Sequence, residues 1–199
     1  MNFLAHCLLA WPGQGWVAGG VLGDFVKGKV PESLPSELRA GVRLHRRIDA
    51  FSNRLADMKP SIARFDTELR RAAPVLLDIV ADHCLALTWP RCAEVTLADF
   101  SAEVYAALCR FDAYVPDRGR PFVARMIDTD LLARYAEPAV RDRALQHVLG
   151  RLRLTHLSPR LASLLDAQLP AFVEDFHDYF PKLQAFAAAE RQRCLDGGA

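Results

Sequence analysis

The sequence has almost no excess charge of either sign. Its 25 Lys and Arg residues oppose 24 Asp and Glu residues, which leaves a net charge of +1 at pH 7. A chain without a large positive excess has no overall electrostatic attraction for nucleic acid or for an anionic membrane surface. We therefore expect neither as a partner, and any charged partner must be recognised by a local patch.

Paired cysteines and a basic leader are also missing. The five cysteines are scattered, odd in number and form no C-x-x-C pair, which excludes a disulfide framework and indicates reduced thiols. The apolar opening segment carries no basic stretch and is interrupted by Pro12, Gly13 and Gly15. It predicts a buried first helix, neither a signal peptide nor a membrane span. We expect a cytoplasmic protein.

Alternation of apolar and polar residues is absent, and the apolar residues instead follow helical spacing. The length of 199 residues fits one domain, and 51% hydrophobic with 25% charged residues is typical of a globular protein. We predict an all-α, single-domain helical bundle over residues 1–199, and the pattern also admits a smaller helical lobe at 92–155. The predicted helices cover residues 2–10, 16–27, 35–53, 60–71, 74–90, 96–112, 119–133, 136–150, 158–167 and 170–195.

The helix predicted at 74–90 is apolar nearly all round, yet it carries three ionisable residues. Asp78 and Asp82 lie four residues apart on one face, and His83 points about a third of a turn away. Buried carboxylates must be paired, protonated or bound to metal, because burial of an unpaired charge is strongly unfavourable. Two interpretations stay open: a metal site, or a buried ion pair that holds helices together.

The helix predicted at 35–53 places His45 and Asp49 on its apolar, core-facing stripe. A single inward histidine is more often a hydrogen-bonded core residue than a ligand. A His and an Asp one turn apart, together with an Asp-His pair on a second buried helix, favour a metal site. Imidazole and carboxylate ligands suit Mn, Fe, Zn or Mg.

Two candidates lie upstream. Asp24 stands in GGVLGDFVKG, whose glycines allow close backbone approach but form neither a G-x-G-x-x-G motif nor a P-loop. Lys27 follows Asp24 by three residues, on the same side of the predicted helix, so it either pairs with Asp24 or holds a phosphate. His6 lies in the apolar run FLAHCLLA and, taken alone, is typical of a core histidine.

Four blocks in a fixed order carry a family resemblance: MNFLAH, GDFVKG, LHRRID followed by Phe51 and Ser52, and LDIVADHCLALTW. Together they resemble the acyl carrier protein phosphodiesterase family over residues 1–90. That family is related to the HD-domain phosphohydrolases, so the resemblance implies their helical core and a divalent metal, usually Mn²⁺, with Mg²⁺ as the alternative. This chain departs from the pattern in having Asp82-His83 in place of His-Asp and Ser52-Asn53 in place of Thr-Asp.

The activity implied by the resemblance is metal-dependent hydrolysis of the phosphodiester that joins 4'-phosphopantetheine to a serine of holo acyl carrier protein. The products would be the apo carrier protein and 4'-phosphopantetheine. Two alternatives remain at this point: an HD-like phosphohydrolase acting on nucleotides, and a helical metal-binding protein without catalytic activity.

The resemblance also implies roles for individual residues. Asp49 or Asp78 would orient His45 or the attacking water. Arginine can hold two phosphate oxygens at once, and arginines that flank the inward stripe would meet an acidic carrier protein. The implied metal ligands are Asp24, His45, Asp82 and His83; the implied catalytic residues are Asp49, Asp78 and His6; and the implied substrate-binding residues are Lys27, Arg39, Arg43, Arg46 and Arg47.

Overall fold

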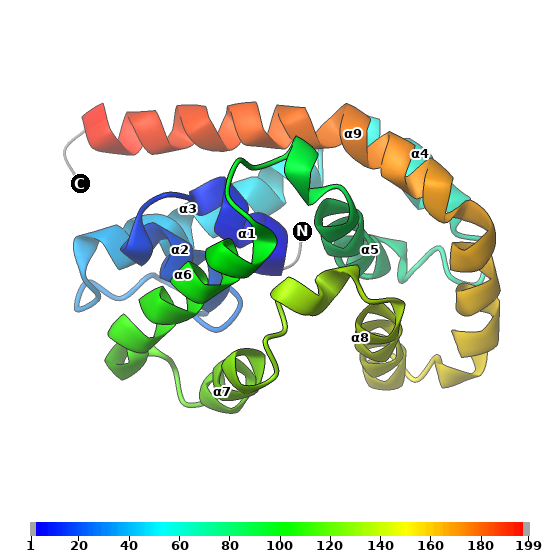
Figure 1. Ribbon diagram of the computed structural model, residues 1–199, viewed down its shortest axis with the longest axis horizontal. Coiled ribbons are helices and arrows are strands. Elements are labelled where there is room, and N and C mark those ends of the chain that lie inside the picture. The colour runs from blue at the N-terminus through cyan, green and yellow to red at the C-terminus, as the bar shows by residue number, and fades with distance from the viewer. Residues whose placement is uncertain (1–2, 197–199) are drawn as a thin grey trace.

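The structure, a computed structural model, describes residues 3–196, and within that range every regular element is helical (Figure 1). The all-α prediction is confirmed. Within the same range, no helix is both long and apolar enough to cross a membrane. The α-helices are α1 (Phe3–Ala10), α2 (Gln14–Leu22), α3 (Ser36–Ser52), α4 (Lys59–Arg64), α5 (Ala73–Leu87), α6 (Leu97–Arg110), α7 (Arg120–Asp128), α8 (Pro138–Arg151) and α9 (Ser158–Asp196).

Three predicted helices end at least five residues earlier than expected. One of them, predicted at 119–133, is α7, which stops at Asp128. Helix α2 stops at Leu22, so Asp24 and Lys27 lie in the loop that leads to α3, not on a common helix face. Helix α4 stops at Arg64, after which the Asp66 carboxylate accepts hydrogen bonds from the N–H groups of Glu68 and Leu69. Such a side-chain acceptor gives the backbone an alternative to helical pairing. The predicted start of the first helix at residue 2 lies outside the described residues.

The helices predicted at 158–167 and 170–195 are one helix, α9, with Pro170 and Pro181 in its interior. Proline removes a backbone N–H and bends a helix, but neither residue ends this one. Buried side chains on both sides of Pro170, including Leu165 and Phe172, keep the helix against the core. In Figure 1, α9 curves along one whole edge of the molecule.

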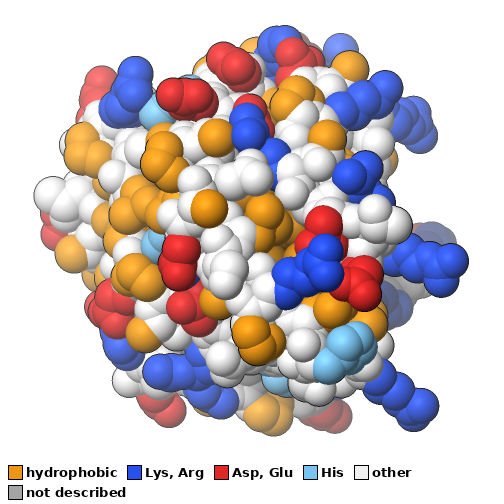
Figure 2. Space-filling view, turned by 90° about the vertical axis from the view of Figure 1, so that its right-hand side faces the viewer, with side chains coloured by type: hydrophobic (Ala, Val, Ile, Leu, Met, Phe, Trp, Pro, Cys, Tyr) orange, Lys and Arg blue, Asp and Glu red, His pale blue; other side chains and the backbone are white. Residues whose placement is uncertain are grey.

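A buried polar contact fastens α9 to α4. The Asp175 carboxylate accepts hydrogen bonds from Arg64 Nε at 2.7 Å, from Arg64 Nη2 at 2.9 Å and from Ser61 Oγ at 2.8 Å. These donors satisfy both oxygens of a carboxylate that is nearly excluded from water. Elsewhere on the surface, Figure 2 shows charged side chains of both signs among hydrophobic ones, in keeping with the near-zero net charge.

Helix α5 runs through the middle of the molecule and packs against α1, α4, α8 and α9. Its Leu76, Val80 and Leu85 are 0% exposed. The prediction that this helix is buried nearly all round is therefore confirmed, and its polar residues must find partners inside the protein.

Helices α2 and α3 approach until their backbones touch. A Cβ added to Gly41 would lie 2.4 Å from the Trp16 carbonyl oxygen, and one added to Gly19 would lie 2.7 Å from the backbone of Gly41. Only glycine fits at such a crossing. The contact brings the end of α2 and the following loop over the second half of α3, where His45 and Asp49 lie.

Because of this crossing, we predict that replacing glycine by alanine lowers stability, although helix propensity alone would favour alanine. Alanine is favoured over glycine in a helix by roughly 1 kcal/mol, yet Gly41→Ala should destabilise the protein by about 1–3 kcal/mol because the methyl group overlaps backbone. Gly150→Ala in α8 is the matched control, since its nearest contact would be at 4.0 Å. Urea denaturation should show Gly150→Ala unchanged or stabilised; equal stability of the two variants would contradict the crossing.

Candidate metal centre

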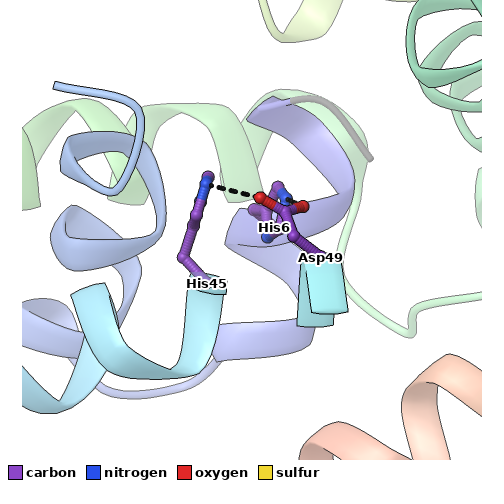
Figure 3. Close-up of side chains that lie close together, drawn as sticks. All are labelled: His6, His45 and Asp49. Atoms are coloured by element: carbon purple, nitrogen blue, oxygen red, sulfur yellow. Dashed lines mark hydrogen bonds and ion pairs between the residues drawn. The ribbon is translucent and has the colours of Figure 1, made fainter. Parts of the chain in front are cut away.

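Helices α1 and α3 bring His6, His45 and Asp49 together (Figure 3). One candidate ligand atom from each residue lies within 4.8 Å of the others. His6 Nε2 is 3.0 Å from Asp49 Oδ1, and His45 Nε2 is 3.3 Å from Asp49 Oδ2. The two imidazole rings stack with centroids 3.8 Å apart. Each carboxylate oxygen thus faces one of two buried histidines.

The orientation of His45 is set by a backbone carbonyl. Its Nδ1 lies 2.7 Å from Gly20 O, and because a carbonyl oxygen only accepts, Nδ1 must carry the proton and donate. Its Nε2 then faces Asp49 Oδ2 at 3.3 Å and Asp24 Oδ1 at 3.9 Å. Nε2 can share a proton with Asp49 or, without that proton, present a lone pair to a metal ion beside the two carboxylates. A histidine that donates its other N–H to a carbonyl is the usual arrangement of a metal ligand.

His6 is held in the neutral form that a ligand requires. Burial lowers its pKa to about 3, and the neighbouring His45 acts in the same direction. Its Nδ1 is buried and has no hydrogen-bond partner within the described part of the chain. A buried ring nitrogen without a partner is unfavourable, so it marks a position where a ligand or water is needed.

The Asp49 carboxylate remains ionised next to these rings. Burial by itself would raise its pKa, but hydrogen bonds with His45 and His6 outweigh burial and hold the pKa well below its usual range. Gly23 makes room for this arrangement, because a Cβ added there would lie 2.2 Å from Cγ of His45. Any side chain at residue 23 would displace the imidazole.

A cleft of about 270 Å³ opens over the cluster. The Asp24 carboxylate, 45% exposed, stands at its edge and can be reached from solvent. The His45 imidazole and the carboxylates of Asp24 and Asp49 line the cleft, and the buried His6 ring stacks behind His45. Together they form a donor set that fits a divalent ion, with room for water in the cleft. The cleft is lined by Gly23, Asp24, Val26, Lys27, Gly28, His45, Arg46 and Asp49.

The structure gives Asp82 a different task from the predicted one. Its side chain is fully buried and accepts the N–H of Leu4 on Oδ2 at 2.8 Å and the N–H of Ala5 on Oδ1 at 3.0 Å. These are orphan N–H groups at the start of α1, so Asp82 caps that helix from α5. It is not in the cluster with His45; instead it fixes the helix that carries His6.

His83 also has partners of its own. Its Nδ1 donates to Tyr135 O at 2.7 Å, and Arg141 Nη1 lies 3.4 Å from its Nε2. Burial lowers the pKa of His83, in keeping with a neutral ring whose two nitrogens are both engaged. The structure therefore does not bring His83 to the candidate metal centre; it ties α5 to the segment before α8.

Asp78 stays within electrostatic range of the cluster. It is half-buried on α5; burial raises its pKa, and the negative charges of Asp49 and Asp24 act in the same direction. The structure thus unites His6, His45 and Asp49, with Asp24 beside them and Asp78 nearby. His6 and Asp49 lie 43 residues apart in the sequence, so helical spacing could not predict their direct contact.

The predicted substrate-binding cations divide into two groups. Lys27 and Arg46 line the cleft, but both terminal nitrogens of Arg46 donate to loop carbonyls, of Gly28 and Val26. Arg47 instead pairs with buried Glu190 of α9 at 2.6 Å, and Arg39 donates to the carbonyl of Glu32. Arg43 is exposed on α3. Lys27 is thus the more exposed of the two cations that line the cleft.

Comparison with known proteins identifies the family of this chain. The family model described as "Acyl carrier protein phosphodiesterase" matches residues 1–183. The chain is 30% identical over 199 residues to proteins named "Acyl carrier protein phosphodiesterase" from Escherichia coli O139:H28 (strain E24377A / ETEC) and Escherichia coli O9:H4 (strain HS). Each match covers 94% of this chain and 98% of the relative. No solved structure matches the chain.

Two substitutions of aspartate by asparagine, which has nearly the same shape, distinguish the metal-binding role of Asp49 from the helix-capping role of Asp82. Asp49→Asn should leave stability within about 1 kcal/mol while weakening divalent-metal binding at least about tenfold. Asp82→Asn should cost about 1–3 kcal/mol of unfolding free energy, because its amide NH₂ would face a backbone N–H, and the folded fraction should keep its metal affinity. Calorimetric titration and urea denaturation measure both. If the Asp82→Asn protein folds but no longer binds metal, Asp82 is a metal ligand and the assignment made here is wrong.

Proposed function

The chain belongs to the acyl carrier protein phosphodiesterase family, a family of phosphoric diester hydrolases, and from that membership we propose its reaction. It hydrolyses the phosphodiester that joins 4'-phosphopantetheine to a serine of holo acyl carrier protein. The products are apo acyl carrier protein and 4'-phosphopantetheine.

One observation carries the proposal: the convergence of His6, His45 and Asp49 below a cleft, within the part of the chain that the family model matches. A phosphodiester resists hydrolysis because its anionic oxygens repel a nucleophilic hydroxide. A site for this reaction needs charge neutralisation and an activated water, and the convergent donor set supports both.

We assign His6, His45, Asp49 and Asp24 as the residues that hold a divalent ion, Mn²⁺ in preference and Mg²⁺ as the alternative. This set replaces Asp82 and His83, whose polar atoms have partners elsewhere. When bound, such an ion neutralises phosphoryl charge and lowers the pKa of a coordinated water from about 15.7 to about 7. The Gly20 carbonyl keeps the His45 ring turned toward the cleft.

The remaining cleft residues act on the phosphate. Lys27 is exposed at the edge of the cleft, and its ammonium would neutralise a phosphate oxygen that points away from the cluster. Asp78, with a pKa raised by burial, would accept a hydrogen bond from a water or donate one when protonated. These roles need no movement of the helices.

The carrier protein would dock on α3. Carrier proteins of this kind are small and strongly acidic, whereas this chain has a net charge of only +1. Arg39 and Arg43 lie on the same helix as His45 and Asp49, and Arg43 is exposed. A local basic rim of this kind would steer an acidic partner toward the cleft.

The reaction is tested by the mass of the carrier protein. Incubation of holo carrier protein with the enzyme and Mn²⁺ should shift its mass to that of the apo form, because the serine ester is cleaved. Excess EDTA should abolish the shift, and Mn²⁺ should restore it better than Ca²⁺, since a site with two imidazoles suits a transition ion more than an oxygen-preferring one.

Full turnover in EDTA, with metal absence verified by elemental analysis, would refute the metal requirement. Consumption of nucleotides with intact holo carrier protein would identify a nucleotide phosphohydrolase instead. Stoichiometric metal without hydrolysis of either substrate would identify a non-catalytic metal-binding protein.

The salt dependence of kcat/KM distinguishes electrostatic docking of the carrier protein from the hydrolysis step. The Debye length falls from about 10 Å at 0.1 M to about 3 Å at 1 M salt, so kcat/KM for holo carrier protein should fall steeply while that for a small phosphodiester falls much less. Arg43→Glu should reproduce the loss at low salt without altering metal content, and Arg151→Glu on α8 serves as the control. Equal salt sensitivity of the two substrates would exclude this docking surface.

A further inference from the structure

The segment that forms one wall of the cleft has no regular structure. Residues 23–30, here called the cleft loop, form the first part of the connection from α2 to α3 and carry Asp24 and Lys27. Backbone carbonyls outside a helix still need hydrogen-bond donors wherever water is restricted. The direction in which Asp24 and Lys27 point therefore depends on what holds the carbonyls of the cleft loop.

From one side, Arg46 of α3 holds the cleft loop. Its Nη1 donates to Gly28 O at 2.7 Å and its Nη2 donates to Val26 O at 2.7 Å. A planar guanidinium that binds two carbonyls fixes both their separation and their orientation. Arg46 therefore links the loop to the helix turn that also bears His45.

From the other side, the loop is held by a segment much further along the chain. Arg118, in the connection from α6 to α7, donates from Nε to Phe25 O at 2.8 Å and from Nη2 to the same oxygen. Phe25 lies between Asp24 and the residues that Arg46 grips. Arg118 thus holds the Phe25 carbonyl, which lies between Asp24 and Lys27 in the sequence and which Arg46 does not bind.

The side chain of Phe25 fits the same distant segment. Its ring centroid is 5.7 Å from that of Phe122 at the start of α7. Gly119 leaves the space for it, because a Cβ there would lie 2.8 Å from Cγ of Phe25. Backbone and side chain of Phe25 are therefore both seated against residues 118–122.

We propose that Arg118 is a positioning residue for this site: by holding the Phe25 carbonyl it sets the placement of Asp24 toward His45 and of Lys27 toward the cleft. The metal-binding part of this inference stands on the contacts above, and the part that concerns turnover rests on the proposed function. It extends the working site into the second half of the chain, which supplies no side chain to the metal cluster among the residues described.

The test compares three arginine variants of the full-length protein. Arg118→Ala should weaken Mn²⁺ binding on the order of tenfold, as loss of a partner that orients a ligand typically does, and should lower kcat/KM for holo carrier protein. Arg118→Lys should recover part of both, because its ammonium can still donate to Phe25 O. Arg125→Ala, an exposed arginine on neighbouring α7, should match the wild type. All three should melt within about 2 °C of the wild type, since these are surface positions.

Mn²⁺ affinity is measured by calorimetric titration and thermal stability by circular dichroism. A folded Arg118→Ala protein with wild-type Mn²⁺ affinity would overturn the proposal and leave Arg118 as an ordinary surface residue. Should that variant not fold, Gly119→Ala pushes Phe25 by its ring instead; weakened Mn²⁺ binding supports the proposal and unchanged binding rejects it. A wild-type protein that binds Mn²⁺ but leaves holo carrier protein intact would refute the proposed function alone.

Discussion

The hydrogen bond from His45 Nδ1 to Gly20 O, at 2.7 Å, is the contact on which the site depends. It places the Nδ1 proton on the Gly20 side and turns Nε2 toward two carboxylates, where a proton or a metal ion can be held. The bond exists because α2 and α3 meet backbone to backbone, with Gly41 against Trp16 O and Gly23 against the His45 ring. The close crossing of α2 and α3 thereby fixes the direction in which His45 Nε2 points.

The second support of the site comes from the protein interior. Helix α1 has only eight residues, and helices this short are marginal in isolation. Asp82 caps it from α5, and the same helix holds His6 in a stack on His45. Asp82 is therefore coupled to the cluster through a helix and not through a bound ion. Burial raises the pKa of Asp82 to about 7, and the hydrogen bonds from the N–H groups of Ala5 and Leu4 act against that shift, so an ionisable residue can persist in the centre of an apolar helix.

Much of this architecture was predictable from local pattern. The apolar stripe of α3 correctly placed His45 inward, because that stripe is a property of one helix, whereas Asp49 on the same stripe lies at the cleft with its side chain 42% exposed. The roles of Asp82 and His83 were not predictable, since their partners, Leu4, Ala5 and Tyr135, lie 52 to 78 residues away. Helical periodicity predicts which face of a helix carries a side chain, but it does not identify the distant segment that packs against that face. The joined helix α9 has the same cause: packing on both sides of Pro170 overrides a local helix breaker.

The central claim is that His6, His45 and Asp49 hold a divalent ion with Asp24 beside them. The most direct measurement is anomalous diffraction from crystals of the protein grown or soaked with Mn²⁺. The account predicts one strong anomalous peak at coordination distance from His45 Nε2 and an Asp49 oxygen, with Asp82 still bonded to the N–H groups of Leu4 and Ala5. A peak coordinated by Asp82 and His83, or no peak at the cluster with saturating Mn²⁺, would contradict it.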